Sequence, residues 1–149
     1  MNLKHGDFEY SLARGISAIE RRHKRFMTNA LEKKGVTGVS YSYVITVKKN
    51  PGLNQDVLAG VHGVDKSRVA RIVRDLEDSG YISRELSPDN RRQYMLFLTE
   101  TGESLYDLIV EKNVEWEALM SGGIEDGNID TTVETINRII ENLDDPVEL

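Results

Sequence analysis

Residues 54–102, NQDVLAGVHGVDKSRVARIVRDLEDSGYISRELSPDNRRQYMLFLTETG, contain the pattern that decides the fold. Asn54 and Asp65 are residue types that cap helix N-termini, and Gly63 stands where a first short helix would end. The spacing predicts one helix from Asn54 to about Gly63 and a second from Asp65 to about Ser79. Two short helices joined by so tight a turn are typical of a helix-turn-helix.

The two predicted helices carry the residues that their crossing requires. Ala59 is small enough to let the helices approach closely, and Gly63 can adopt the positive φ that the turn needs. The apolar side chains expected to lock the second helix onto the first are Leu58, Val64, Val69 and Ile72. The match of all these features in one register favours the helix-turn-helix.

On a helical wheel the second helix has one apolar arc and one polar side. The apolar arc contains Val69, Ile72, Val73 and Leu76. The polar side and its edges carry Lys66, Ser67, Arg68, Arg71 and Arg74. Arginine can bind guanine or a phosphate and serine can reach either, so we expect this side to enter the major groove of DNA. The alternative is a solvated side whose arginines pair with Asp75, Glu77 and Asp78.

A hairpin is predicted directly after these helices. Residues 81–86 and 93–99 are rich in aromatic and branched side chains, which favours two strands. The segment Ser87-Pro88-Asp89-Asn90 between them has turn chemistry, and Arg91 and Arg92 follow it. In this position the hairpin would be a wing, and we expect its tip arginines to reach the DNA, with a minor groove as their site.

Further helices are predicted on both sides of this region. The first has an apolar stripe at Phe8, Leu12, Ile16, Ile19, His23, Phe26 and Ala30 and ends near Gly35, and another helix covers residues 40–47. Thr99 is expected to cap a long helix, and Asp130 a last one with its stripe at Val133, Ile136, Ile140 and Leu143. Because these stripes flank the chain ends, we expect them to bury against a second copy in a two-fold dimer. Packing within a single copy is the alternative for each stripe.

Charge is distributed unevenly over the 149 residues, whose net charge is -6. Residues 1–50 hold ten basic and four acidic residues, residues 51–92 hold seven of each, and residues 93–149 hold two basic and fourteen acidic. Only the charge of the contacting face decides which partner is attracted. The acidic balance therefore argues against a protein that coats DNA and not against one that binds a specific site.

Several classes of function find no support in the sequence. There is no cysteine, which excludes disulfides and thiolate chemistry, and no apolar run near the roughly 18 residues that span a bilayer. No phosphate-binding glycine loop, HExxH motif or nucleophile elbow occurs, and His5, His23 and His62 are scattered. We therefore expect a cytoplasmic protein that is not an enzyme, with no cofactor, no metal site and no membrane partner.

Residues 54–102 resemble the winged-helix core of the MarR regulators. The likeness lies in Leu58-Ala59, the helix of residues 69–82, the segment NRRQ at 90–93 and LTETG at 98–102. It extends over the flanking helices and implies a single MarR-like domain over 1–149. Within it, 36–99 would form the winged helix-turn-helix lobe, and 1–35 and 100–149 the dimerisation helices. The chain departs from the family pattern at Arg74-Asp75, where the family often has Asp-Arg, and at Asn90, where it often has Asp.

The resemblance also implies a function. Such proteins are homodimers that bind pseudo-palindromic operators in double-stranded DNA, usually as repressors released by small phenolic or anionic effectors. By that likeness Ser67, Arg68, Arg71 and Arg74 would meet the major groove and Arg91 the minor groove. An effector pocket is expected between the dimer helices and the winged lobe, lined by His23, Phe26, Tyr41 and Tyr43. The alternative is that these side chains form part of the core, as aromatic residues at helical spacing more often do. The competing hypothesis is a winged helix that binds proteins without specific DNA binding.

Overall fold

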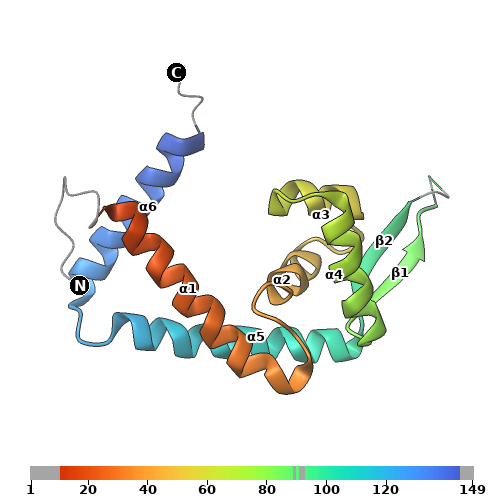
Figure 1. Cartoon of the computed structure of the whole chain (residues 1–149), viewed down its shortest axis with the longest axis horizontal. Coiled ribbons are helices and arrows are strands. Elements are labelled where there is room, and N and C mark those ends of the chain that lie inside the picture. Colours follow the sequence, from red (N-terminus) through yellow and green to blue (C-terminus); the bar gives the residue numbers. More distant parts are fainter. Residues whose placement is uncertain (1–10, 89, 91–92, 145–149) are drawn as a thin grey trace. The chain divides into compact units, whose positions relative to one another are not determined.

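The computed structural model of the chain describes residues 11–88, 90 and 93–144. Their elements are α1 (Leu12–Leu31), the 3-10 turn η2 (Glu32–Lys34), α2 (Tyr41–Lys49), α3 (Gln55–His62), α4 (Lys66–Asp78), β1 (Ile82–Leu86), β2 (Tyr94–Leu98), α5 (Glu100–Ser121) and α6 (Asp126–Asp144) (Figure 1). The predicted fold class, mainly α with one small β-hairpin, is confirmed.

Two compact units make up the chain, residues 1–114 and residues 115–149, and the boundary between them falls inside α5. The predicted boundaries at 35/36 and 99/100 do not coincide with this division. The reason is that both flanking helices contribute to the core of the first unit. Met27 and Leu31 of α1 and Leu105 and Ile109 of α5 are each at most 2% exposed.

The core of the first unit brings α1, α2, α3, α4, the hairpin and the start of α5 together. Its most deeply buried side chains are Met27, Leu31, Tyr43, Val44, Val47, Leu58, Val69, Val73, Leu96, Leu105 and Ile109. The helices α1, α2, α4 and α5 each contribute residues spaced three or four apart, which places them on one face of each helix. Burial of that shared apolar surface is the main force that holds the helix-turn-helix in position.

The helix-turn-helix forms with the predicted caps. The side chain of Asn54 accepts a hydrogen bond from the Val57 amide at 2.9 Å, and that of Asp65 accepts one from the Arg68 amide at 2.9 Å. Gly63 joins the two helices with φ of 60°, a left-handed conformation that costs glycine little. The turn is closed by the Val64 amide, which donates to the Ala59 carbonyl at 3.2 Å.

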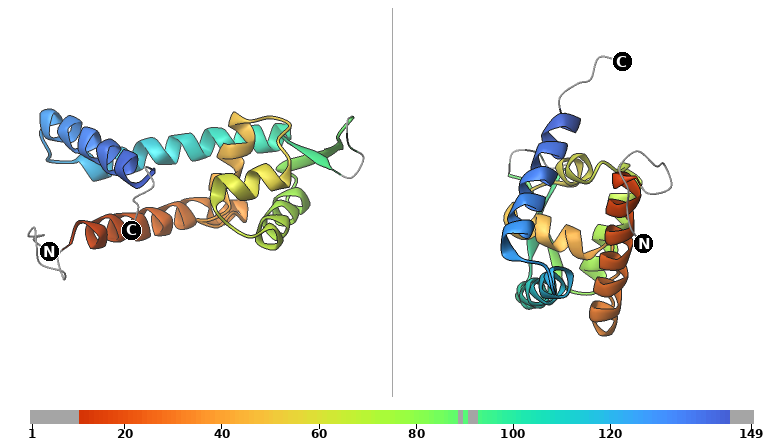
Figure 2. Two further views of the ribbon diagram at one scale, coloured as in Figure 1. Left: turned by 90° about the horizontal axis from the view of Figure 1, so that it is seen from above. Right: turned by 90° about the vertical axis from the view of Figure 1, so that its left-hand side faces the viewer.

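The wing consists of β1 and β2, paired antiparallel from Ile82 opposite Leu98 to Leu86 opposite Tyr94. Figures 1 and 2 show the hairpin projecting from the end of the lobe beside α4. The predicted strands were longer by a residue at one or both ends. One pairing was not predicted: the Gly52 amide donates to the Leu96 carbonyl and the Leu96 amide donates to the Leu53 carbonyl, each at 2.9 Å. These bonds tie the segment before α3 to the wing.

The helix α5 begins at a close contact with the lobe. The Thr99 hydroxyl accepts a hydrogen bond from the Gly102 amide at 3.0 Å, as expected of an N-cap. A Cβ atom on Gly102 would lie 2.1 Å from the Tyr81 carbonyl oxygen, and no flexible side chain is there to give way. The glycine of the LTETG segment is therefore required because the helix backbone passes directly against residue 81.

The structure shows where the last and the first helices begin. The prediction that Asp130 caps the last helix is wrong, because α6 already begins at Asp126 and the Glu125 carbonyl accepts from the amides of Asn128 and Ile129. Gly123, with φ of 77°, lies in the short connection between α5 and α6, and α6 begins three residues after it. At the other end α1 begins after Ser11, whose side chain accepts from the Arg14 amide, and Phe8 of the predicted stripe lies outside the described residues. None of the described helices is both long and apolar enough to cross a membrane.

Candidate nucleic-acid interface and adjoining cavity

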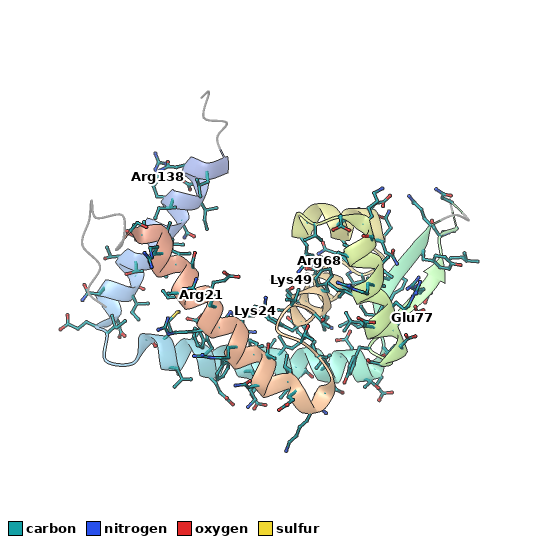
Figure 3. All side chains as sticks on the ribbon, viewed as in Figure 1. Arg21, Lys24, Lys49, Arg68, Glu77 and Arg138 are labelled. Atoms are coloured by element: carbon teal, nitrogen blue, oxygen red, sulfur yellow. The ribbon has the colours of Figure 1, made fainter. Side chains whose placement is uncertain are left out.

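The helix α4 divides into a buried and an exposed side, as the wheel predicts. Val69, Ile72, Val73 and Leu76 are 0% to 7% exposed and belong to the core. All five predicted DNA-contacting residues of this helix, Lys66, Ser67, Arg68, Arg71 and Arg74, are exposed. Figure 3 shows Arg68 on α4, away from the hairpin side of the helix where Glu77 is labelled. The cations are therefore available on the surface of one short, rigid helix.

Arg68, Arg71 and Arg74 form no ion pair with another described residue. In the part of the chain that the structure describes, the salt bridges of α4 join Lys66 Nζ to Asp56 Oδ1 at 2.9 Å and Glu77 to Arg84. The predicted alternative, arginines of α4 paired with Asp75, Glu77 and Asp78, is not found among these described residues. The Lys66 pair is highly exposed on both sides, so it contributes little to stability and can exchange for a phosphate.

Ser67 is engaged at the start of the helix. Its hydroxyl donates to the Asp65 carboxylate, which also accepts from the Arg68 amide. These two bonds, the serine hydroxyl first, lower the pKa of Asp65 below its usual 3.8. Asp65 is thus charged at neutral pH, and a ligand that bound the Ser67 hydroxyl would compete with the helix cap.

An ion pair between Arg84 and Glu77, which was not predicted, joins the wing to α4. Arg84 Nε of β1 lies 2.8 Å from Glu77 Oε2 of α4, an ion pair without hydrogen-bond geometry at the Nε–H group. The Glu77–Arg84 pair thus joins α4 to the first strand of the wing. Arg91 and Arg92, the predicted minor-groove contacts, lie outside the described residues.

A cavity of about 310 Å³ lies next to α4. Its lining residues come from α1, α2, the loop before α2, α3 and α4, and they are Glu20, His23, Lys24, Gly38, Val39, Tyr41, Ser42, Tyr43, His62, Val64 and Arg68. Three of the four predicted pocket residues, His23, Tyr41 and Tyr43, are among them. Phe26 is not, and it packs against the hydrophobic core instead.

Two aromatic contacts shape the cavity wall. The rings of Tyr43 and His62 are stacked with centroids 4.0 Å apart, and the Thr46 hydroxyl lies 3.0 Å from His62 Nε2. Burial lowers the pKa of His62 below its usual 6.5, so the ring is neutral at neutral pH. On the other side His23 meets Tyr41 edge-on, with centroids 6.0 Å apart, and its Nε2 lies 3.1 Å from Asn113 Oδ1 of α5.

Burial also acts on the two tyrosines of the wall. It raises the pKa of Tyr41, and the Glu20 carboxylate adds to this rise. It raises the pKa of Tyr43 as well, although the nearby Arg68 guanidinium opposes the shift. Both phenols therefore remain protonated at neutral pH.

Lys24, His62 and Arg68 were not predicted to line this cavity. His62 could have been found from the sequence, since it follows buried Leu58 by four residues and so lies on the same face of α3. Lys24 gave no such signal, because it lies between the predicted apolar positions of α1. Among the described residues no group of three or more histidine, aspartate or glutamate side chains could hold a metal ion.

Comparison with known proteins agrees with this geometry. Residues 36–94 match the MarR family. The chain is 31% identical over 134 residues to a candidate transcriptional regulatory protein for the hcr operon of Thauera aromatica, an alignment that covers 90% of this chain and 79% of that protein. It superimposes on a crystal structure of MarR with a TM-score of 0.84 and 32% identity, covering 94% of this chain and 95% of that one.

A third likeness concerns the fold alone. A candidate MarR family regulator from Listeria monocytogenes, crystallised with a 26mer DNA, superimposes with a TM-score of 0.79 at 23% identity, covering 89% of each chain. The winged-helix architecture, the family match over residues 36–94 and the relatives at 31% and 32% identity all agree. The chain therefore belongs to the MarR family and is a DNA-binding transcriptional regulator, not an enzyme.

Proposed function

We propose that this protein is a homodimeric repressor that binds a pseudo-palindromic operator in double-stranded DNA and is released by a small phenolic or anionic effector. The observation that carries the proposal is the exposed side of α4, where Arg68, Arg71 and Arg74 are exposed and form no ion pair among the described residues. Arginines on a rigid helix can bind guanine edges or phosphates. Arg91 and Arg92 of the wing are proposed to add contacts in a flanking groove.

Apolar side chains left exposed on the outer helices support the dimer. On α1, Leu12, Ile16 and Ile19 are 58%, 44% and 49% exposed. On α6 the four apolar residues of one stripe are also exposed, namely Val133, Ile136, Ile140 and Leu143. Regularly spaced apolar residues that a single chain leaves in water favour a second copy as their partner. A two-fold dimer would place its two α4 helices roughly 34–36 Å apart, one turn of DNA.

The effector is proposed to occupy the cavity beside α4. Its lining combines aromatic rings with the cations Lys24 and Arg68, which suits a small aromatic molecule with a phenol or an anionic group. A ligand releases the operator only when it binds the DNA-free state more tightly than the DNA-bound state. The cavity is formed within one protomer, so each copy in a dimer would hold its own ligand.

Selection of bound fragments from the source genome, followed by affinity measurements on the recovered duplex, tests the DNA site. The logarithm of the affinity should fall linearly with that of salt concentration, by about 0.9 for each phosphate contacted. Arg71→Ala should weaken binding roughly tenfold and reduce that slope by about 1. The matched control is Arg138→Ala on α6, an exposed arginine paired only with Glu141 in the described contacts, which should change neither quantity.

Two outcomes would contradict the proposal. If the wild-type chain bound no duplex above background in about 50 mM salt, a winged helix that binds proteins would take its place. The direction of regulation needs a separate measurement, a reporter fused to the recovered promoter. Deletion of the regulator should raise the reporter's expression, and a fall would indicate an activator.

A further inference from the structure

An ion pair joins the starts of the two helices of the helix-turn-helix. Lys66 is the first residue of α4, and its Nζ lies 2.9 Å from Oδ1 of Asp56 in the first turn of α3. Both side chains are largely in solvent, 76% and 54% exposed. Lys66 is one of the residues predicted to contact DNA, so a carboxylate of the chain itself occupies a cation that DNA would use.

Two of the five predicted contacts on α4 are held by carboxylates in this way, and both stand in its first turn. Asp56 pairs with Lys66, and Asp65 accepts a hydrogen bond from the Ser67 hydroxyl. The three arginines farther along the helix form no ion pair with a described residue. Competition from the chain's own carboxylates is therefore confined, among the described residues, to the start of α4.

The two carboxylates differ in what else they do. Asp65 is the N-cap of α4 and accepts a hydrogen bond from the Arg68 amide at 2.9 Å. The N-cap of α3 is Asn54, whose side chain accepts from the Val57 amide, so α3 does not need Asp56 as a cap. The Asp56 carboxylate can therefore be replaced by an amide without loss of a helix cap.

A phosphate bound to Lys66 would lie close to Asp56. Charge-assisted bonds between nitrogen and oxygen are about 2.8 Å long. With Lys66 in its present position, 2.9 Å from Asp56, a phosphate oxygen on the same nitrogen would lie within about 6 Å of the carboxylate. Salt screens charges over about 8 Å at physiological ionic strength, so the two anions would repel each other. DNA must break the ion pair or bear this repulsion.

The surroundings of Asp56 offer it no second unpaired cation among the described residues. It lines a hollow of about 200 Å³ between the start of α3 and the wing. Among the described residues of that lining, Arg84 is the basic one, and it already pairs with Glu77 of α4. An Asp56 carboxylate that lost Lys66 to a phosphate would therefore need a cation from solution.

We propose that Asp56 is an internal competitor of the DNA backbone, whose carboxylate occupies Lys66 and weakens the binding of every duplex whatever its sequence. The inference rests on the proposed function and adds a residue that limits its affinity. Phosphate contacts carry no sequence information and supply nearly all non-specific binding. A carboxylate that weakens such a contact reduces occupancy of the many non-operator sites that a genome offers.

The alternative is that Asp56 positions Lys66 for a phosphate. The two readings differ in the sign of one measurement. Under competition, removal of the Asp56 charge frees Lys66 and tightens DNA binding. Under positioning, the same change releases the Lys66 side chain from its place and weakens DNA binding.

The experiment uses the full chain, the recovered operator duplex and an unrelated duplex of the same length. Fluorescence anisotropy gives both affinities between about 50 and 200 mM salt. The variants are Asp56→Asn, Lys66→Gln and the two combined, which form a double-mutant cycle. The matched control is Glu100→Gln, which removes a carboxylate from the first turn of α5, where it forms no ion pair with a described residue.

Asp56→Asn should tighten the binding of both duplexes by roughly threefold to fivefold at the lowest salt concentration, the range of an exposed charge pair. Its salt dependence should be steeper by up to about 0.9, because no cation is taken up beside residue 56 to offset the counterions that DNA releases. In the Lys66→Gln background the same change should give no gain. Glu100→Gln should alter neither the affinity nor the slope, and circular dichroism should show every variant folded.

Three outcomes would overturn the inference. They are unchanged or weakened operator binding by Asp56→Asn, an equal gain in the Lys66→Gln background, and an equal gain in Glu100→Gln. The last two would show a general effect of net charge that does not pass through Lys66. Each is observed while the wild type binds its operator, so the proposed function would stand. A wild type that bound no duplex would overturn the proposed function and this inference with it.

Discussion

The helices α4 and α6 have the same apolar periodicity and opposite surroundings. On α4 the apolar residues Val69, Ile72, Val73 and Leu76 are at most 7% exposed. On α6 the stripe of Val133, Ile136, Ile140 and Leu143 is 42% to 77% exposed. The first stripe is covered by the lobe to which its helix belongs, whereas no described residue of the chain covers the second to a similar degree.

This difference shows what an amphipathic pattern establishes. A repeat of three and four residues predicts a helix and identifies the face that is costly to leave in water. It does not identify the partner, which for α4 is the lobe and for α6 is proposed to be a second copy of the chain. Substitutions on the two helices test this contrast.

Removing a core side chain from α4 should have the largest effect on folding. Leu76 is 3% exposed, so Leu76→Ala should lower the free energy of unfolding by about 2–5 kcal/mol through lost burial and the cavity left behind. Urea denaturation followed by circular dichroism measures this loss. Asp78→Ala, an exposed change on the same helix, is the control and should stay within about 0.5 kcal/mol of the wild type.

A charged residue placed in the apolar stripe of α6 should weaken the association of two copies of the chain. Ile136 is 42% exposed, and Ile136→Asp should weaken dimer formation on the order of 100-fold, since a carboxylate would be buried against apolar side chains. Thr131→Asp places the same charge on the opposite face of α6 and should leave the dimer intact. Sedimentation equilibrium measures both, and an unaltered dimer with Ile136→Asp would remove α6 from the proposed interface.

The ion pair on α4 should contribute more to the free energy of unfolding than the ion pair on α6. Glu77 of α4 holds Arg84 of the wing, whose side chain is only 23% exposed, while Arg138 and Glu141 of α6 form a pair that is 75% and 64% exposed. Glu77→Gln should cost about 1–2 kcal/mol because it leaves the partly buried guanidinium without its counter-charge. Glu141→Gln should cost under about 0.5 kcal/mol. Equal losses in urea denaturation would show that the Glu77 pair contributes no more than a surface pair.

The smallest effect concerns acid stability at the start of α4. The pKa of Asp65 is lower in the folded chain than in the unfolded chain, so its stabilising effect is complete above about pH 4 and is lost as pH falls through the folded value. Asp65→Asn keeps an N-cap acceptor for the Arg68 amide but cannot titrate. Urea denaturation between about pH 5 and pH 3 should therefore show a shallower loss of stability in the variant. Identical slopes would show that Asp65 does not couple protonation to folding.

Much of the fold was predictable because its signals are local. Asn54, Gly63 and Asp65 act through backbone hydrogen bonds within three or four residues, and each occupies the predicted position. The start of α6 was not predictable from capping preference, since Glu125, which is not a preferred capping residue, precedes the helix and Asp130 lies inside it. The requirement for glycine at position 102 depends on Tyr81, twenty-one residues away, and no local rule reveals it.

For the candidate site, the sequence by itself determined which side of α4 would be exposed, because one short helix with four buried apolar residues leaves only one side for its arginines. Only the tertiary structure decided that Arg68 shares a cavity with Lys24, Tyr43 and His62, which come from three other helices. The physical reason is the distance along the chain over which each kind of interaction acts. Helix caps and apolar periods act between neighbours in the chain, whereas a cavity exists only where the packing of separate helices leaves space between them.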